Sequence, residues 1–247
     1  MRIAVEFQSE SGIRIPVKYN YYFQSLLYSL APKSNVHDRG FGERNYKLLT
    51  FSRPIGKCKY LKESGVLLFE NGVKWVVSSV DDTFLEEVAT NLIKANPVAL
   101  ARQRLSVRSI EVMKIPPPEV FKRTLTVKML SPMTVYSTLH DAAGNKKTYF
   151  YTPFEDAFSE KLRENLERKF KALYESPPTD GTFEIQPVNP RKEWEKITIY
   201  KKTVIKGWMG IYRIQGNPEL LRLAYDSGLG SRNSQGFGCF EITHERR

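Results

Sequence analysis

The chain is organised around a loop near its C-terminal end, Gly228-Leu-Gly-Ser-Arg-Asn-Ser-Gln-Gly-Phe-Gly238. Two Gly-apolar-Gly triplets flank five residues, among them Arg232, Asn233 and Ser234. Glycine permits positive φ and a close approach of the backbone, which makes this a tight and irregular segment. Backbone N–H groups beside an Arg, an Asn and a Ser suit a phosphate chain. On the pattern alone, the alternative is a structural turn that binds nothing.

The elements on either side of the loop exclude two common nucleotide-binding motifs. Asn217-Pro218-Glu219 predicts the start of a helix before the loop, and residues 239–242 predict a strand after it. Dinucleotide loops and P-loops have the opposite order, because their phosphates meet the N-terminus of a following helix. The Gly-Lys-Ser/Thr of a P-loop is also missing.

The composition favours a globular protein with a polyanionic partner. A length of 247 residues fits two domains of ordinary size or one large one, and 41% hydrophobic residues are enough for a core. Lys and Arg number 38 against 27 Asp and Glu, which gives a formal net charge of +11. Nucleic acid is the commonest partner of so basic a chain.

The sequence predicts neither a cofactor nor a metal. Cys58 and Cys239 are the only cysteines and neither belongs to a CxxC pair, while the three histidines lie far apart. Residues 1–7 are typical of a strand and not of a signal peptide. No apolar run approaches the length that spans a membrane. We therefore expect a cytoplasmic protein without membrane association.

The order of elements in the first half predicts a ferredoxin-like β-α-β-β-α-β domain. Apolar periodicity and turn residues define the elements. Asn71-Gly72 is a strong turn dipeptide and predicts that the third and fourth strands form a hairpin. The predicted elements are a strand over 2–8, a helix over 20–31, strands over 46–52, 66–69 and 73–79, a helix over 82–96 and a strand over 105–114.

The same order repeats after Pro116-Pro117-Pro118, which cannot extend a helix or a central strand. We predict two tandem ferredoxin-like, RRM-like domains of the α+β class, over residues 1–115 and 119–247. Thr152-Pro153-Phe154-Glu155 predicts the capped start of a long helix, in which Phe154, Phe158, Leu162, Leu166 and Phe170 recur every four residues. The other predicted elements are strands over 121–129, 183–186, 196–206 and 208–214, the helix from Asn217 and the last strand.

Aromatic and basic residues alternate in two segments, residues 18–22 and 194–208. Aromatic rings can stack bases while basic side chains follow the phosphates. Candidate RNA contacts are therefore Lys18, Tyr21, Lys201 and Lys202. The alternative is a solvated strand face with inward aromatics, and it is the stronger interpretation for any single residue.

The glycine loop resembles the C-terminal signature of the RAMP superfamily of CRISPR proteins. Further motifs narrow the resemblance to the Cas6 family, the endoribonucleases that cut CRISPR repeat transcripts (pre-crRNA) into guide RNAs. The resemblance spans both halves of the chain. The motifs are Ile15-Pro-Val-Lys-Tyr-Asn-Tyr-Tyr-Phe-Gln-Ser-Leu-Leu-Tyr-Ser-Leu30, Tyr46-Lys-Leu-Leu-Thr-Phe-Ser52, Leu130-Ser-Pro-Met133 and Thr152-Pro153.

The resemblance implies a metal-independent cut in which the 2′-hydroxyl attacks the neighbouring phosphate, leaving a 2′,3′-cyclic phosphate and a 5′-hydroxyl. It also implies a Tyr, a His and a Lys near the first helix, which match Tyr28, His37 and Lys47 here. His37 is the acid–base group, Tyr28 its partner on the 2′-hydroxyl side, and Lys47 stabilises the charge on phosphorus. Which group is acid and which is base is left open. A Lys⁺ beside Tyr28 would lower the pKa of the phenol.

Repeat RNA is the expected partner. A homodimer and association with other CRISPR effector-complex proteins are left open. The alternative function is a non-catalytic repeat-binding protein or effector-complex subunit, which would share the charge and the loop. Further residues expected to hold RNA are Arg39, Arg44, Gly228, Gly230, Arg232, Asn233, Ser234, Gly236 and Gly238.

Overall fold

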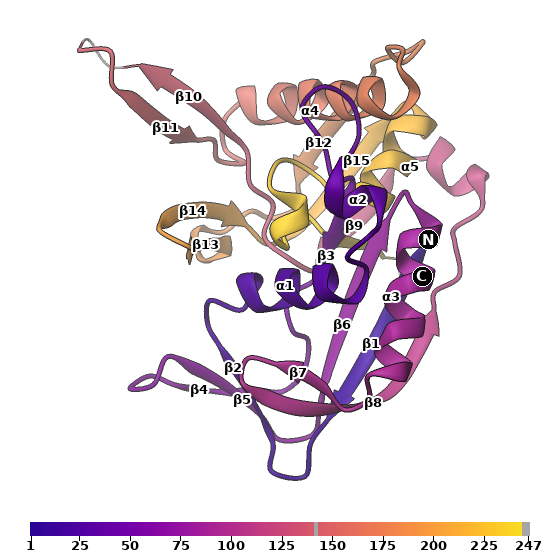
Figure 1. Cartoon of the computed structure of the whole chain (residues 1–247). Coiled ribbons are helices and arrows are strands. Elements are labelled where there is room, and N and C mark those ends of the chain that lie inside the picture. Colours follow the sequence, from indigo (N-terminus) through magenta and orange to yellow (C-terminus); the bar gives the residue numbers. More distant parts are fainter. Residues whose placement is uncertain (141–142, 244–247) are drawn as a thin grey trace.

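A computed structural model describes residues 1–140 and 143–243, except for the side chains of Asn35 and His37. The chain forms two α+β units side by side, each with a four-stranded ferredoxin-like antiparallel arrangement (Figure 1). The first unit contains β1 (Arg2–Gln8), β2 (Ile13–Pro16), α1 (Asn20–Leu30), α2 (Asn35–Asp38), β3 (Leu49–Phe51), β4 (Cys58–Leu61), β5 (Val66–Phe69), β6 (Val73–Ser79), α3 (Asp82–Lys94), β7 (Val98–Leu100) and β8 (Gln103–Val112).

The first sheet has the order β3-β6-β1-β8-β7, with β1 antiparallel to both of its neighbours. Without the edge strand β7, this is the strand order of the predicted ferredoxin-like domain. One face of β1 packs on the helices, as its alternating pattern predicts. The opposite face is buried as well, because Ala4 and Val76 pack against Cys239 of the second unit. The two units therefore share a packed interface along their central strands.

The predicted hairpin around Asn71-Gly72 is wrong. β5 pairs with β2 and β4 in a separate three-stranded sheet, whereas β6 pairs with β1 and β3. The turn dipeptide thus connects two sheets. A turn signal specifies a reversal of the chain, and tertiary packing decides which strands pair.

The second unit repeats the topology with the sheet order β12-β15-β9-β16. Its elements are η1 (Pro118–Lys122), β9 (Leu125–Met129), β10 (Tyr136–His140), β11 (Lys146–Phe150), α4 (Ala157–Tyr174), β12 (Phe183–Pro187), η2 (Lys192–Trp194), β13 (Glu195–Tyr200), β14 (Thr203–Trp208), β15 (Ile211–Gly216), α5 (Pro218–Ser227), η3 (Asn233–Gln235) and β16 (Phe240–Ile242). The β10–β11 hairpin projects from the body of the molecule (Figure 1).

Several boundaries in the second unit differ from the prediction. The single strand expected over 196–206 is the hairpin β13–β14, with Lys201 at its turn. Glu155 accepts a hydrogen bond from the Thr152 backbone N–H at 2.8 Å, but this closes a turn and α4 begins only at Ala157. Phe154 consequently lies outside the buried stripe of α4 and is 54% exposed.

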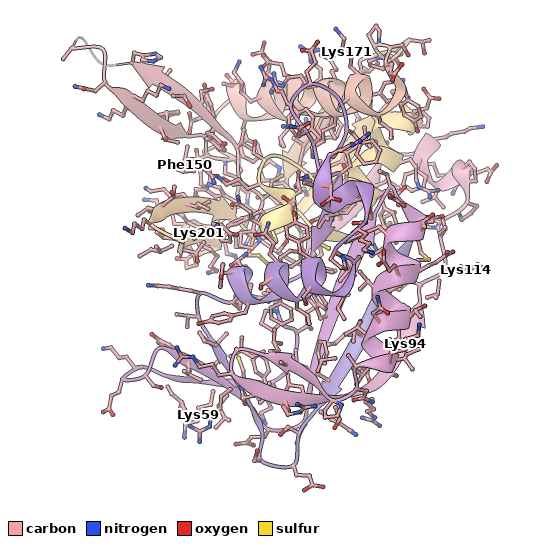
Figure 2. The ribbon with its side chains drawn as sticks, viewed as in Figure 1. Lys59, Lys94, Lys114, Phe150, Lys171 and Lys201 are labelled. Atoms are coloured by element: carbon pink, nitrogen blue, oxygen red, sulfur yellow. The ribbon has the colours of Figure 1, made fainter. Side chains whose placement is uncertain are left out.

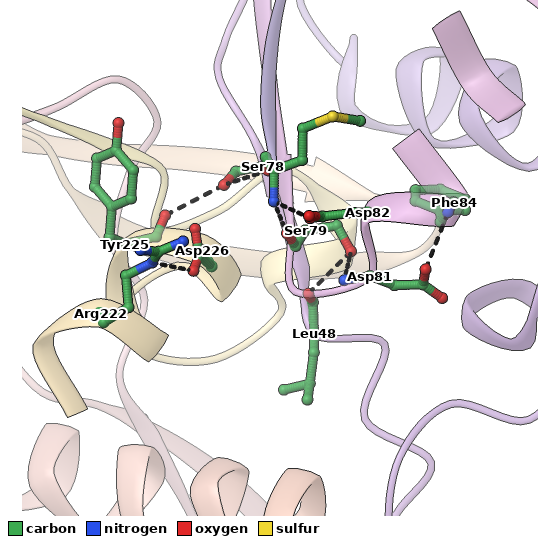
Figure 3. Close-up of polar contacts among 10 residues, drawn as sticks. Leu48, Ser78, Ser79, Asp81, Asp82, Phe84, Arg222, Tyr225 and Asp226 are labelled. Carbon is green, nitrogen blue, oxygen red and sulfur yellow. Dashed lines mark hydrogen bonds and ion pairs between the residues drawn. The ribbon is translucent and has the colours of Figure 1, made fainter. Parts of the chain in front are cut away.

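Each unit has its own hydrophobic core, one formed by residues between 3 and 105 and the other by residues between 121 and 240. The exact domain boundary at residues 116–118 stays a prediction. Polar contacts also join the units. Ser78 Oγ on β6 donates to the Tyr225 carbonyl at 3.3 Å, beside the Arg222–Asp226 ion pair of α5 (Figure 3). The buried Arg2 side chain donates to the Phe240 and Tyr225 carbonyls at 2.8 and 2.6 Å.

Candidate active site

The glycine loop, residues 228–238, fastens the second unit to the first. Four of its carbonyl oxygens accept hydrogen bonds from side chains of α1 and β3. Asn20 donates to the Gln235 and Gly236 carbonyls at 2.7 and 3.3 Å, Gln24 to the Ser234 carbonyl at 2.8 Å and Thr50 to the Phe237 carbonyl at 2.9 Å. The loop therefore fixes the position of α1 relative to the second unit.

Many N–H groups of the loop are already bonded within the fold. Asn233 is buried, and its amide donates to the Leu229 and Phe237 carbonyls at 3.0 Å each. The loop therefore has the structural role that the sequence left open as an alternative. RNA binding by the loop stays a prediction. The loop residues whose N–H groups donate to backbone carbonyls are Gly228, Leu229, Ser231, Gln235, Gly236 and Gly238.

A cavity of about 510 Å³ opens between the two units beside this loop, and we call it the interdomain cavity. The first unit contributes the segment before β3, and the second contributes α4, β10 and the glycine loop. Five basic residues and no carboxylate belong to its lining, so it suits an anion. The lining residues are Arg44, Asn45, Tyr46, Lys47, Leu48, Leu49, Tyr136, Thr138, Asn165, Arg168, Lys169, Gly230, Ser231, Arg232, Asn233 and Ser234.

Lys47 lies on the first unit's side of this cavity, two residues before β3. Asn45 and Leu48 on either side of it have positive φ, so the chain turns sharply here. Lys47 is half-buried, and partial burial lowers the pKa of its ammonium while the Asp38 carboxylate raises it. Asp38 thus favours the charged form of Lys47 next to the cavity.

Tyr28 lies on α1 and reaches the glycine loop. Its phenol hydrogen-bonds with the side chains of Ser234 and Gln24, and Ser234 lines the interdomain cavity. Burial nevertheless raises the pKa of Tyr28 above 10.0, more than these hydrogen bonds lower it. The expectation that a neighbouring Lys lowers this pKa is therefore wrong: the phenol is neutral near pH 7.

His37 lies in α2, a four-residue helix between Tyr28 and Lys47 in the chain, and its side chain is outside the described residues. Contacts hold the two residues beside it: Val36 is buried in the first core, and Asp38 interacts with Lys47. Beyond α2 the chain packs on the second unit at Gly42, whose φ is +60°. A β-carbon there would lie 2.8 Å from Ala172 Cβ of α4, so only glycine allows this approach.

Other predicted contacts lie outside the lining of the interdomain cavity. Lys18 and Arg39 are exposed, Tyr21 is 48% exposed, and Lys201 and Lys202 occupy the β13–β14 turn (Figure 2). Arg44 and Arg232 do line it. Within the segment 194–208, Tyr200 and Trp208 are buried, as the alternative of inward aromatics anticipated.

Sequence reasoning missed the contribution of α4. Asn165, Arg168 and Lys169 line the cavity, and Lys169 Nζ donates to the Gly228 carbonyl at 2.7 Å. Complete burial lowers the pKa of Lys169 to about 7, with a smaller effect of Arg168 in the same direction. In the sequence these residues resemble the solvated face of an amphipathic helix, and only the packing of the two units covers them.

A larger cleft of about 620 Å³ lies elsewhere between the units and also carries basic residues. Its lining includes Arg2, Arg53, Lys74, Lys114 and Lys128, and none of the predicted site residues. Over residues 1–140 and 143–243, no three His, Cys, Asp or Glu side chains gather as metal ligands would. No helix in that part of the chain has the length and apolarity to cross a membrane.

Fold and cavity together define a protein of two tandem ferredoxin-like domains with a basic site between them and a glycine loop at its edge. The family model described as CRISPR associated protein Cas6, C-terminal, matches residues 115–242. The chain belongs to the Cas6 family.

Curated relatives resemble the chain over most of its length, and solved structures share its fold. The CRISPR-associated endoribonuclease Cas6 1 of Methanocaldococcus jannaschii is 25% identical, with 96% of this chain and 91% of that protein covered. The CRISPR-associated endoribonuclease Cas6 of Pyrococcus furiosus is 26% identical, with 94% and 85% covered. A solved structure of a Cas6-related gene from P. furiosus has a TM-score of 0.83 at 22% identity, covering 100% of this chain and 99% of that one. Another, described as a RAMP protein binding different RNA substrates, has a TM-score of 0.82 at 21% identity, covering 99% and 100%.

Proposed function

We propose that this protein is a metal-independent endoribonuclease that cuts CRISPR repeat transcripts to guide RNAs. The observation that carries the proposal is the interdomain cavity. It brings Lys47 to a site whose lining holds five basic residues and no carboxylate, and Ser234 links that site to Tyr28. The relatives named as endoribonucleases cover more than nine-tenths of this chain, which supports the same activity.

The proposed reaction uses only the RNA and the side chains of His37, Lys47 and Tyr28. The 2′-oxygen attacks phosphorus, and the bond from phosphorus to the 5′-oxygen breaks. One proton leaves the 2′-hydroxyl and another reaches the departing 5′-oxygen, so a base and an acid are required. The products are a 2′,3′-cyclic phosphate and a 5′-hydroxyl.

His37 is the proposed acid–base group, since an imidazole with an ordinary pKa near 6.5 both gives and accepts protons at neutral pH. Lys47 faces the cavity and stabilises the negative charge that gathers on the phosphoryl oxygens. Tyr28 is protonated because burial raises its pKa. We therefore assign it as a hydrogen-bond donor on the 2′-hydroxyl side, where its partner His37 accepts the 2′-hydroxyl proton and then donates a proton to the departing 5′-oxygen.

A second candidate function is non-catalytic binding of repeat RNA. The same basic cavity and glycine loop would serve it, and one solved structure of the same fold is described as a RAMP protein binding different RNA substrates. Only a cleavage assay distinguishes the endoribonuclease from the non-catalytic binding protein. Protein in excess over labelled repeat RNA should cut it in the presence of EDTA, and a single 2′-deoxy substitution at the cut nucleotide should abolish the cut.

The ends of the fragments complete the test. A 2′,3′-cyclic phosphate on the upstream fragment supports attack by the 2′-oxygen. A 3′-hydroxyl with a 5′-phosphate, or cleavage that EDTA stops, would refute the proposed mechanism. Binding without any cleavage would favour the second candidate.

A further inference from the structure

The second unit's side of the interdomain cavity contains two buried polar atoms without a hydrogen-bond partner among the described residues. Asn165 Oδ1 of α4 is an acceptor, and Arg232 Nε of the glycine loop is a donor. Asn165 is only 8% exposed. Leaving such atoms unpaired costs stability, so their presence at a cavity points to a ligand.

Lys169 provides a donor beside Asn165. The two residues are four positions apart on α4 and therefore neighbours on one helix face. Lys169 is 3% exposed, and one of its N–H groups binds the Gly228 carbonyl, which leaves at least one more N–H group to donate. Asn165 can present its oxygen as an acceptor, or its NH₂ as a donor after a half-turn of the side-chain amide. With the N–H groups of Lys169, this wall can offer an acceptor and a donor together.

Arg232 provides a planar group on the same side of the cavity. Its guanidinium carbon lies 5.1 Å from the centre of the Tyr136 ring, and both residues line the cavity. An unstacked RNA base binds a protein by stacking on an aromatic ring or on an Arg plane while its edge forms hydrogen bonds. The volume of about 510 Å³ lies in the range of small-ligand pockets.

We infer that this wall binds one unstacked nucleobase of the RNA next to the cut phosphate. The base stacks against the Arg232–Tyr136 pair, and Asn165 and Lys169 form hydrogen bonds with its edge. The inference rests on the proposed function in one respect, because the ligand is the same RNA. It adds a specificity-determining wall that is distinct from the groups assigned to chemistry.

The test uses repeat RNA blocked by a 2′-deoxy at the cut nucleotide, so that binding is measured apart from cleavage. Each nucleotide flanking the cut is replaced in turn by an abasic site and by each other base, and the Kd is measured. One position should lose about tenfold in affinity in the wild type, the size of one base contact. Asn165→Leu should reduce that preference to nearly nothing.

Stability separates this role from a structural one. Asn165→Leu should raise the Tm of the free protein, because it removes an unpartnered buried oxygen. Lys169→Met should weaken the same base preference. Lys171→Met, on the exposed side of the same helix (Figure 2), should leave both the preference and the Tm unchanged.

The outcomes are separable. A flat base profile in the wild type, or a profile that Asn165→Leu and Lys169→Met leave intact, would overturn the inference even if the RNA is cut. A position-specific preference that both variants abolish supports it even if the wild type never cleaves. Failure of the wild type to bind repeat RNA at all would refute both proposals.

Discussion

The two walls of the interdomain cavity come from two copies of one fold, yet they differ in construction. In the first unit α1 ends after 11 residues, and Lys47 comes from an irregular segment that includes the short α2. In the second unit α4 continues for 18 residues and presents Asn165, Arg168 and Lys169 from a rigid helix. An irregular segment can aim single groups at one atom, whereas a helix presents a fixed row of side chains.

Under the proposed function, this difference assigns separate roles to the two walls. The first wall carries the groups assigned to chemistry, and the second positions the RNA. The glycine loop connects the walls, because its carbonyls bind α1 and β3 on one side and Lys169 on the other. Each prediction below tests one part of this division.

The largest effect is expected from the first wall. His37→Ala should lower the single-turnover cleavage rate by about 10²–10⁴-fold, because a positioned acid–base group contributes that much. The Kd for repeat RNA should not change. His140→Ala is the matched control, since His140 is exposed at the end of β10. Equal rate losses in the two variants would rule out His37 as the acid–base group.

The second largest effect is expected in the glycine loop, which connects the two walls. Gly238 has φ +79°, and a β-carbon there would lie 2.0 Å from the Leu229 carbonyl oxygen. Gly238→Ala should lower the free energy of unfolding by about 3 kcal/mol, through left-handed backbone strain and overpacking. Gly144→Ala is the control: φ is +81° but no described residue beyond its chain neighbours lies within 4 Å of the added carbon, so the loss should be about 1 kcal/mol. Urea unfolding measures both, and equal losses would show that the loop is not tightly packed.

On the second wall, burial of Lys169 should make the free energy of unfolding depend on pH. The pKa of Lys169 is about 7 when folded and near its ordinary 10.5 when unfolded. Between these values only the unfolded chain holds the proton, so stability increases as the pH rises above 7. The unfolding free energy of the wild type minus that of Lys169→Met should grow by roughly 2 kcal/mol from pH 7 to pH 9. A difference independent of pH would mean that Lys169 is not buried as described.

The smallest effect is expected at Tyr28. Burial raises the pKa of its phenol, and under the proposed function this phenol donates a hydrogen bond on the 2′-hydroxyl side. Tyr28→Phe should therefore slow cleavage only about tenfold, the value of one hydrogen bond. The pH–rate profile should keep its shape. A loss as large as that of His37→Ala, with a limb of the profile missing, would make Tyr28 the base.

Much of the fold was predictable because each element carries local signals. Alternation marks β1, Asn217 caps α5 by accepting from the Glu219 N–H, and the strand orders of both sheets follow from the repeated β-α-β-β-α-β pattern. The pairing of β5 was not predictable from Asn71-Gly72, because the turn specifies no partner.

The segment around Lys47 and the glycine loop could be named from the sequence, whereas the α4 side of the cavity could not. Lys47 and Tyr28 follow from sequence motifs that resemble the family, and the structure places Lys47 at the cavity and Tyr28 against a residue that lines it. Asn165 and Lys169 carry no such signal. Their surroundings arise from contacts between residues far apart in the chain, such as Lys169 with Gly228. Burial of a polar residue on a helix becomes visible only when the packing is known.

The most direct test compares two cations that face the same cavity from opposite walls, Lys47 and Arg168. Single-turnover rates at saturating protein and Kd values for uncleavable RNA are measured for Lys47→Met and Arg168→Ala. The account predicts that Lys47→Met lowers the saturated rate by about 10²-fold with an unchanged Kd. It predicts that Arg168→Ala weakens the Kd by about tenfold with an unchanged saturated rate. The same signature in both variants would contradict the division between chemistry and binding.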